Sequence, residues 1–223
     1  MVEVKICGIT DAPGRDAAIE GGARWLGFVF VPASARVLTP DVAAPLVAGT
    51  AGRAIPVGLF ADAGDAEIQA VLDQVPLAML QAHGSETPAR IAALRARFGL
   101  PVIKAIGIEQ AEDLGNAVHG PQAFATAADA LLLDAKPPKD GRGGPTGGHG
   151  RAFDWRVLAG WHSPLPWLLA GGLNVDNLAQ AVAATGAAAV DISSGVERQR
   201  GRKDPAMIRA FLAHAAALGA PEV

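Results

Sequence analysis

Polar residues that could carry out acid–base chemistry stand directly after short apolar runs. Cys7 follows VEVKI, His83 follows LQA, and Asp134 follows LLL. A thiolate can take up a proton and a carboxylic acid can give one, so Cys7 is a candidate base and Asp134 a candidate general acid. Each residue also has a simpler interpretation. Cys7 could be a small buried apolar residue, and Asp134 could cap a turn or pair with Lys136 or Lys139.

Lys5 stands two residues before Cys7. Side chains alternate along a strand, so the two side chains are expected on the same side. If that side is the interior of the fold, the ammonium would lie beneath the thiol and favour the thiolate. The spacing therefore predicts a thiol whose pKa is lowered by Lys5.

Two small-residue segments are candidates for binding an anion. Gly171 and Gly172 follow one apolar run, and the segment Ser193-Ser194-Gly195 follows Asp191-Ile192 after another. Glycine lets the backbone approach a ligand closely, and exposed N–H groups at a short helix start bind anions. Together the segments predict a phosphate site, although a glycine pair alone is also common in ordinary turns. Asp191 is expected on the same side as Ser193.

These residues need elements to position them, and the chain offers eight short apolar runs separated by helical patterns. Consecutive apolar positions are typical of strands buried on both faces, as in parallel sheets. The expected strands are Val2–Cys7, Trp25–Val31, Ala54–Phe60, Leu77–Gln81, Pro101–Ile106, Ala130–Asp134, Trp167–Ala170 and Ala189–Ile192. The expected helices are Asp65–Val75, Thr87–Phe98, Asn174–Thr185 and Pro205–Leu218, with weaker ones at Pro13–Gly21, Asp41–Gly49, Gln110–Val118 and Trp155–Leu158.

Eight βα units favour an α/β fold of the (β/α)8 TIM barrel type over a doubly wound sheet. No linker divides the chain, so residues 1–223 are expected to form a single domain. In such barrels the chemistry lies at the carboxyl ends of the strands. The Gly- and Pro-rich stretch 137–150 follows the sixth strand, where it could be an active-site lid or a disordered surface loop.

Composition excludes several classes of partner. The 22 acidic and 19 basic residues give a net charge of −3, which argues against nucleic acid. No apolar run reaches about 18 residues, so no membrane segment is expected, and the N-terminus does not resemble a signal peptide. One cysteine favours a cytoplasmic location. No metal site is expected, because the histidines lack ligand spacing; they are His83, His119, His149, His162 and His214.

A family resemblance rests on motifs spread over nearly the whole chain. They are KICGIT at 5–10, GFVF at 27–30, Ser34 with Arg36, QAHG at 81–84, FDW at 153–155, LAGGL at 169–173, DISSGVE at 191–197 and GRKD at 201–204. With these motifs the chain resembles phosphoribosylanthranilate isomerases, the (β/α)8 enzymes of tryptophan biosynthesis. Two positions depart from the family pattern, where Ala82 replaces a leucine and His149 replaces a threonine in the Gly-rich stretch.

The resemblance implies an Amadori rearrangement of N-(5'-phosphoribosyl)anthranilate without a cofactor. It places the general base on Cys7 and the general acid on Asp134. It further implies that Arg36 holds the anthranilate side of the substrate and that His83 contacts the substrate, although either could be an ordinary loop residue. Asp191 would touch ribose hydroxyls or orient its loop. The only partner expected is a phosphorylated small molecule, on a monomer or weak homo-oligomer.

Two other functions compete with this interpretation. The chain could be another phosphosugar enzyme on the same fold, such as indole-glycerol-phosphate synthase or the histidine-pathway isomerase. The first should need further Lys and Glu residues at strand ends, and the second is expected to use an aspartate on the first strand. A barrel that only senses a phosphorylated metabolite is disfavoured by Cys7, Asp134 and Arg36 standing together.

Overall fold

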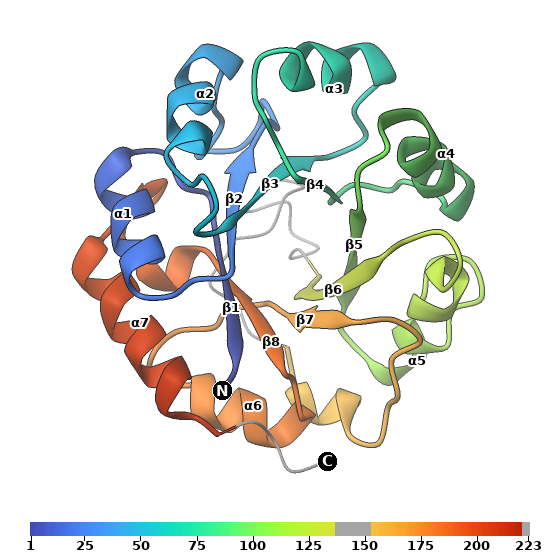
Figure 1. The fold of residues 1–223 in the computed structure, drawn as a ribbon. Helices are drawn as coiled ribbons and strands as arrows, with labels where there is room; N and C mark the ends of the chain where they lie inside the picture. The colour runs from blue at the N-terminus through green and yellow to red at the C-terminus, as the bar shows by residue number, and fades with distance from the viewer. Residues whose placement is uncertain (137–152, 220–223) are drawn as a thin grey trace.

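Eight parallel strands form a closed barrel in the computed structural model, which describes residues 1–136 and 153–219 (Figure 1). The strands pair in chain order, and β1 closes the ring by pairing with β8. Their bounds are β1 (Glu3–Cys7), β2 (Trp25–Val29), β3 (Ile55–Phe60), β4 (Met79–Ala82), β5 (Val102–Ile108), β6 (Ala130–Ala135), β7 (Trp167–Leu169) and β8 (Ala189–Ile192). The expected TIM barrel is therefore confirmed.

Each strand buries both faces, which explains why its sequence is apolar at consecutive positions. In β6, Leu132 packs inside the barrel with Ile103 and Val57, whereas Leu131 and Leu133 belong to the larger core between the barrel and the helices. The inside is apolar toward the amino ends of the strands. Polar side chains gather inside the barrel nearer the carboxyl ends, at what we call the mouth.

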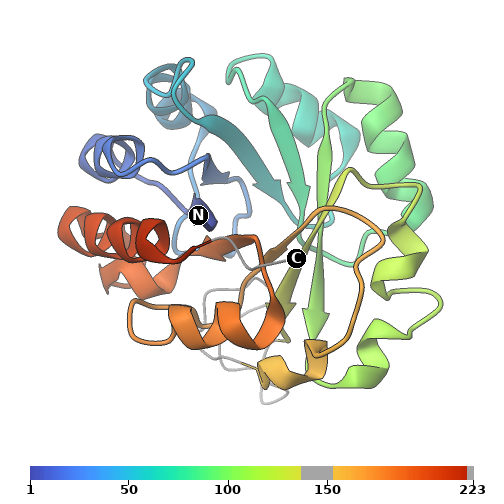
Figure 2. The same cartoon turned by 60° about the horizontal axis from the view of Figure 1, so that its bottom comes forward.

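Helices cover the outside of the barrel. They are α1 (Ala12–Glu20), α2 (Pro40–Ala48), α3 (Asp65–Leu72), α4 (Pro88–Phe98), α5 (Ala111–Leu114), α6 (Leu178–Thr185) and α7 (Pro205–Ala217), with 3₁₀ turns at Pro121–Phe124, Trp155–Leu158 and Ser194–Val196. α1 and α7 lie side by side and contact each other, which places the last described helix next to the first, beside β1 (Figures 1 and 2). None of the described helices is long and apolar enough to cross a membrane.

Local side-chain bonds explain where helices begin and end. Thr87 caps α4 by accepting a hydrogen bond from the Arg90 N–H, as the Thr-Pro sequence predicted. α6 begins at Leu178 rather than at the expected Asn174, because the Asn174 side chain accepts the N–H groups of Asp176 and Asn177 and holds a turn there. Asn116 likewise accepts two backbone N–H groups, so the expected helix 110–118 ends after one turn.

One element was missed by the sequence analysis. After β8 and a 3₁₀ turn, the chain forms a short antiparallel hairpin of β9 (Glu197–Gln199) and β10 (Arg202–Lys203). Its sequence is mostly charged, which gives no apolar strand signal. The hairpin carries Glu197 and Lys203 to the mouth of the barrel. The proposed lid, 137–150, lies outside the described residues.

Candidate active site

Cys7 lies at the mouth end of β1 and is only 5% exposed. It pairs in register with Gly27 of β2, and a side chain there would not fit, because a Cβ on Gly27 would lie 2.9 Å from Cys7 Sγ and 3.1 Å from Lys5 Nζ. The Cys7 thiol and the Lys5 ammonium therefore both lie directly over Gly27. This confirms that Lys5 and Cys7 point to the same side.

The Lys5 ammonium is fully buried and forms a 2.7 Å ion pair with Asp191 of β8. Burial alone would lower the pKa of Lys5, but the charges of Asp191 and Cys7 outweigh it and hold that pKa above its usual value. Burial raises the pKa of the Cys7 thiol, Lys5 lowers it, and Asp191 raises it again. The net pKa of Cys7 is raised. Lys5 lowers the pKa of the thiol as expected, but desolvation and the carboxylate of Asp191 exceed the effect of Lys5.

Arg36 lies beyond β2 with its guanidinium buried against Glu197. Its Nε and Nη2 donate to the two carboxylate oxygens at 2.7 and 2.8 Å. Lys203 donates to the same carboxylate at 2.7 Å. Burial would raise the pKa of Glu197, but the bonds and charges of Arg36 and Lys203 hold it below its usual value. Glu197 thus joins two cations at the mouth.

The two predicted phosphate-binding segments lie next to each other. A Cβ on Gly195 would lie 2.0 Å from the carbonyl oxygen of Leu173, so the loop after β8 packs directly on the loop after β7. Gly171 and Gly172 have φ angles of +88° and +67°, which favour glycine. Ser193 links this region to Cys7, because its hydroxyl donates to the carbonyl oxygen of Cys7 at 3.0 Å.

Ser194, which completes the second segment, begins the 3₁₀ turn Ser194–Val196 and is half-buried. Lys203 donates to the carbonyl oxygen of Ser193 at 2.9 Å. The lysine that neutralises Glu197 therefore also holds the backbone of the predicted phosphate loop.

Asp134 is the penultimate residue of β6, across the mouth from Cys7, and its side chain is 13% exposed. Its Oδ1 accepts the N–H of Ala135 at 2.8 Å, and its Oδ2 lies 3.4 Å from Nε2 of His83. Lys136 pairs with Asp113 instead of Asp134, and Lys139 lies outside the described residues. Asp134 therefore faces His83 rather than the nearby Lys136.

His83 is held from below by Gln81 of β4. The side-chain nitrogen of Gln81 lies 2.9 Å from Nδ1 of His83, and the His83 N–H donates to the carbonyl oxygen of Phe60 at 2.8 Å. Gln81 is fully buried. Sequence reasoning named His83 but missed Gln81, although its place two residues earlier puts it on the same side of the strand.

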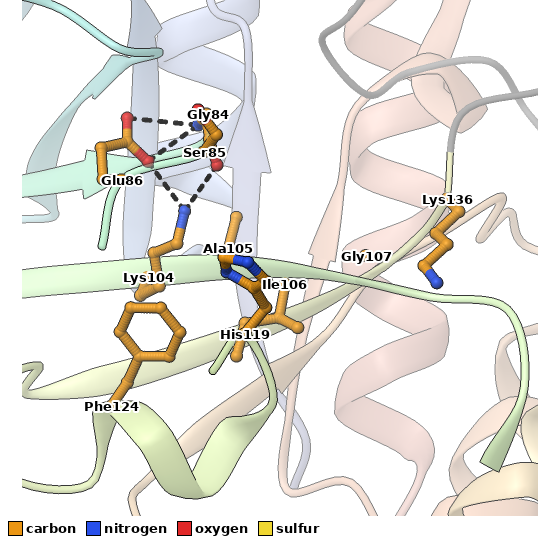
Figure 3. A pocket seen from close by; sticks show the side chains of 10 residues that line it. All are labelled: Gly84, Ser85, Glu86, Lys104, Ala105, Ile106, Gly107, His119, Phe124 and Lys136. Carbon is orange, nitrogen blue, oxygen red and sulfur yellow. Dashed lines mark hydrogen bonds and ion pairs between the residues drawn. The ribbon is translucent and has the colours of Figure 1, made fainter. Parts of the chain in front are cut away.

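A cavity of about 290 Å³ lies beside this half of the mouth, over the outer side of β5 (Figure 3). At its edge the Lys104 ammonium, 3% exposed, donates to the Gly84 carbonyl oxygen and to Glu86, both at 2.7 Å. Glu86 also accepts the N–H groups of Asp62 and Gly84, at 2.8 and 3.0 Å. This buried pair ties the loop that follows His83 to β3 and β5.

Comparison with known proteins identifies the family. The sequence profile described as N-(5'phosphoribosyl)anthranilate (PRA) isomerase matches residues 4–214. The chain belongs to the phosphoribosylanthranilate isomerase family. The N-(5'-phosphoribosyl)anthranilate isomerase of Paracoccus denitrificans is 51% identical over 97% of this chain and 98% of its own. That of Paramagnetospirillum magneticum is 52% identical over 95% of both chains.

Solved structures of the family share the fold. The isomerase from Thermotoga maritima superposes with a TM-score of 0.83, at 33% identity over 98% of this chain and 100% of its own. A family structure in complex with reduced 1-(o-carboxyphenylamino)-1-deoxyribulose 5-phosphate has a TM-score of 0.81, at 30% identity over the same shares. The resemblance seen in the sequence and the expected enzyme class are confirmed.

Proposed function

We propose that this phosphoribosylanthranilate isomerase converts N-(5'-phosphoribosyl)anthranilate into 1-(o-carboxyphenylamino)-1-deoxyribulose 5-phosphate, with Cys7 as general base and Asp134 as general acid. Family membership supports the reaction. The observation that carries the assignment is the placement of these two side chains on β1 and β6, at the same mouth and three strands apart around the closed barrel. A substrate lying across the mouth would meet one on each side.

The reaction needs one proton given and one taken. Asp134 gives its proton to the ring oxygen while the bond from C1 to that oxygen breaks, and the nitrogen lone pair forms a double bond to C1. Cys7, as thiolate, then takes the proton from C2, and the electrons of that C–H bond form the enolamine. Return of a proton to C1 and loss of the enol proton give the ketose. Atoms balance between substrate and product, as an isomerisation requires.

The buried charges around Cys7 suit both a thiolate and an anionic substrate. Lys5, Arg36 and Lys203 are cationic, and Asp191 and Glu197 are their carboxylates. One positive charge is therefore in excess when the thiol is neutral. Loss of the thiol proton neutralises this excess, so the cations favour the thiolate, and a substrate anion is attracted by the same charge.

The substrate carries a carboxylate and a phosphate, which we assign to opposite parts of the mouth. Arg36 meets the anthranilate carboxylate through the N–H groups that Glu197 leaves available, because a guanidinium fork suits a carboxylate. The phosphate binds the loops after β7 and β8, at Gly171, Gly172 and the segment 193–195. Asp191 is held by Lys5 at the edge of this site, and His83 meets the substrate from β4.

The wider organisation of the protein is also proposed. We assign residues 1–223 to one domain in the cytoplasm, supported by the biosynthetic role of the family and by its single unpaired thiol. We expect a monomer or weak homo-oligomer. The related Thermotoga maritima enzyme is described as dimeric, and one of its solved structures is of monomers generated from that dimer. Light scattering over a range of protein concentrations measures which state this chain adopts.

Turnover tests the proposed function. The purified chain is expected to consume N-(5'-phosphoribosyl)anthranilate, followed by the loss of its fluorescence, and to restore growth of a cell lacking the isomerase. A sensor of the same metabolite would bind the substrate without consuming it. Substrate binding without turnover by the wild-type chain would therefore contradict the proposal.

A further inference from the structure

Among the described residues inside the mouth, Gln81 alone has a buried side-chain oxygen without a hydrogen-bond partner. Its side chain is fully buried, its Nε2 contacts Nδ1 of His83 at 2.9 Å, and its Oε1 has no hydrogen-bond partner. A buried polar atom that loses its bonds to water and gains no partner destabilises the folded chain. An apolar side chain at this position of β4 would avoid that cost, so the contact with His83 calls for an explanation.

The contact determines where the ring carries its proton. An amide nitrogen can only donate, so Nδ1 of His83 must accept with its lone pair. In the neutral ring the proton then sits on Nε2, and Nε2 is the atom that lies 3.4 Å from Oδ2 of Asp134. The Gln81 amide therefore directs an N–H group toward the carboxyl group.

We propose that Gln81 is a positioning residue of the isomerase, which fixes His83 as the neutral Nε2–H tautomer facing Asp134. The inference rests on the proposed function, because it gives His83 a task in the acid step. When the O–H bond of Asp134 breaks and its proton passes to the ring oxygen, a carboxylate is left. That charge is met by the Nε2–H of His83 and by the Ala135 N–H, which already donates to Oδ1 at 2.8 Å.

The distance agrees with this role. At 3.4 Å the two atoms are slightly beyond an ordinary hydrogen bond, and such contacts at catalytic groups shorten when charge develops. A donor that is stronger toward a carboxylate than toward a carboxylic acid favours release of the proton. His83 thereby assists the acid while its own protonation state stays the same.

The backbone of His83 is held by other contacts, so the contact with Gln81 serves to orient the ring. The His83 N–H donates to Phe60, and the next residue, Gly84, is held by the buried pair of Lys104 and Glu86 (Figure 3). These bonds fix the loop after β4. Among the side chains the structure describes, Gln81 alone contacts Nδ1.

Nitrogen NMR of the histidine-labelled chain tests the tautomer without any substrate. The His83 resonances are assigned by their loss in His83→Asn. We expect Nδ1 unprotonated and Nε2 protonated in the wild type at a pH where the ring is neutral. In Gln81→Glu, a carboxylate accepts from Nδ1, so the proton should move to Nδ1 or both nitrogens should become protonated. A wild-type ring protonated on Nδ1 would overturn the inference.

Kinetics test the positioning role. Gln81→Met keeps the volume and removes the donor, and Gln81→Glu keeps the shape and reverses its polarity. Both should lower kcat by between about tenfold and 100-fold with little change in KM, the scale of a misplaced catalytic group. Met79→Leu, a volume-conserving change on the same strand facing the apolar interior, should leave both constants unchanged.

The outcomes separate the inference from the proposed function. Wild-type kcat in Gln81→Glu, or a loss of kcat in Met79→Leu as large as in Gln81→Met, would overturn the positioning role while isomerase activity stands. A wild-type chain that shows the Nε2–H tautomer but no turnover would overturn the proposed function instead. If Gln81→Met fails to fold, the NMR and kcat of Gln81→Glu still decide the inference.

Discussion

The two halves of the barrel mouth surround the two proposed proton-transfer groups with physically different environments. On the side of β1 and β8, the thiol lies among buried charged side chains, namely Lys5, Arg36, Asp191, Glu197 and Lys203. On the side of β4 and β6, Asp134 faces the ring of His83, which is held by the neutral amide of Gln81. The first half acts through charge and the second through hydrogen-bond direction.

The difference follows from the chemistry of each group. A free thiol has a pKa above neutrality and gains little from a single donor, so charge is the effective means of changing it. A carboxyl group accepts well-directed hydrogen bonds, and small changes in their geometry change how readily it releases a proton. Substitutions of the charged residues near β1 and β8 should therefore change how the rate depends on pH. Substitutions near β4 and β6 should change kcat at a fixed pH.

The largest expected effect comes from removing the proposed base, Cys7. Cys7→Ser keeps the shape but replaces the thiol with an alcohol that barely ionises near neutral pH. We expect kcat to fall by about 10²–10⁴-fold with KM nearly unchanged, because the lost interaction belongs to the transition state. Steady-state kinetics measure this, and a variant with near wild-type kcat would exclude Cys7 as the base.

Removing the proposed acid, Asp134, should have the next largest effect. Asp134→Asn keeps the size of the side chain and removes its transferable proton, so kcat should fall by about 10²-fold or more. Glu112→Gln, at an exposed position on α5, is the matched control and should leave the kinetics unchanged. Equal effects of the two variants would show that Asp134 has no special role.

Glu197→Gln tests whether the charged half is held together by one carboxylate. Leaving Arg36 and Lys203 buried without their shared anion should destabilise the fold by about 3 kcal/mol. The pKa of Glu197 is lowered in the folded chain, so its stabilising contribution is present above its ordinary pKa and is lost as pH falls through the lowered one. Denaturant unfolding should therefore show wild type and variant converging in acid. A difference that does not depend on pH would contradict this.

Lys5→Met should have a smaller effect whose size depends on pH. Without the ammonium, the pKa of Cys7 should rise further, because burial and Asp191 both oppose the thiolate. Each additional pKa unit lowers the thiolate fraction about tenfold at neutral pH, and raising the pH should restore kcat/KM. The double variant Lys5→Met with Asp191→Asn removes both charges and should recover part of the loss. A pH profile of Lys5→Met that matches the wild type would contradict the tuning role of Lys5.

Much of the fold could be predicted because parallel strands buried on both faces produce continuous apolar runs. β8 has the expected bounds, and most other strands differ by one or two residues at an end. The helix ends were harder, since they depend on single side chains such as Asn116 and Asn174, which hold turns inside segments that read as helical. The hairpin of β9 and β10 gave no apolar signal.

The candidate site was predictable where one strand supplies two residues. The spacing of Lys5 and Cys7 placed both on the inner side of β1. Whether the pKa of the thiol lies above or below its ordinary value could not be predicted from that spacing. That direction depends on burial and on Asp191, which reaches the same space from the far end of the chain. Gln81 was overlooked for a similar reason, since its contact with His83 points to a role only once the structure shows that His83 also faces Asp134.

Titration of the single thiol tests the central claim most directly. The chain has one cysteine and no tyrosine, so the ultraviolet absorbance of the thiolate can be followed against pH without overlap from tyrosinate. We expect Cys7 to titrate above the pKa of a free thiol, and kcat/KM to rise with pH along the same curve in the free enzyme. A kcat/KM that reaches its plateau while absorbance still shows a protonated thiol would contradict Cys7 as the base.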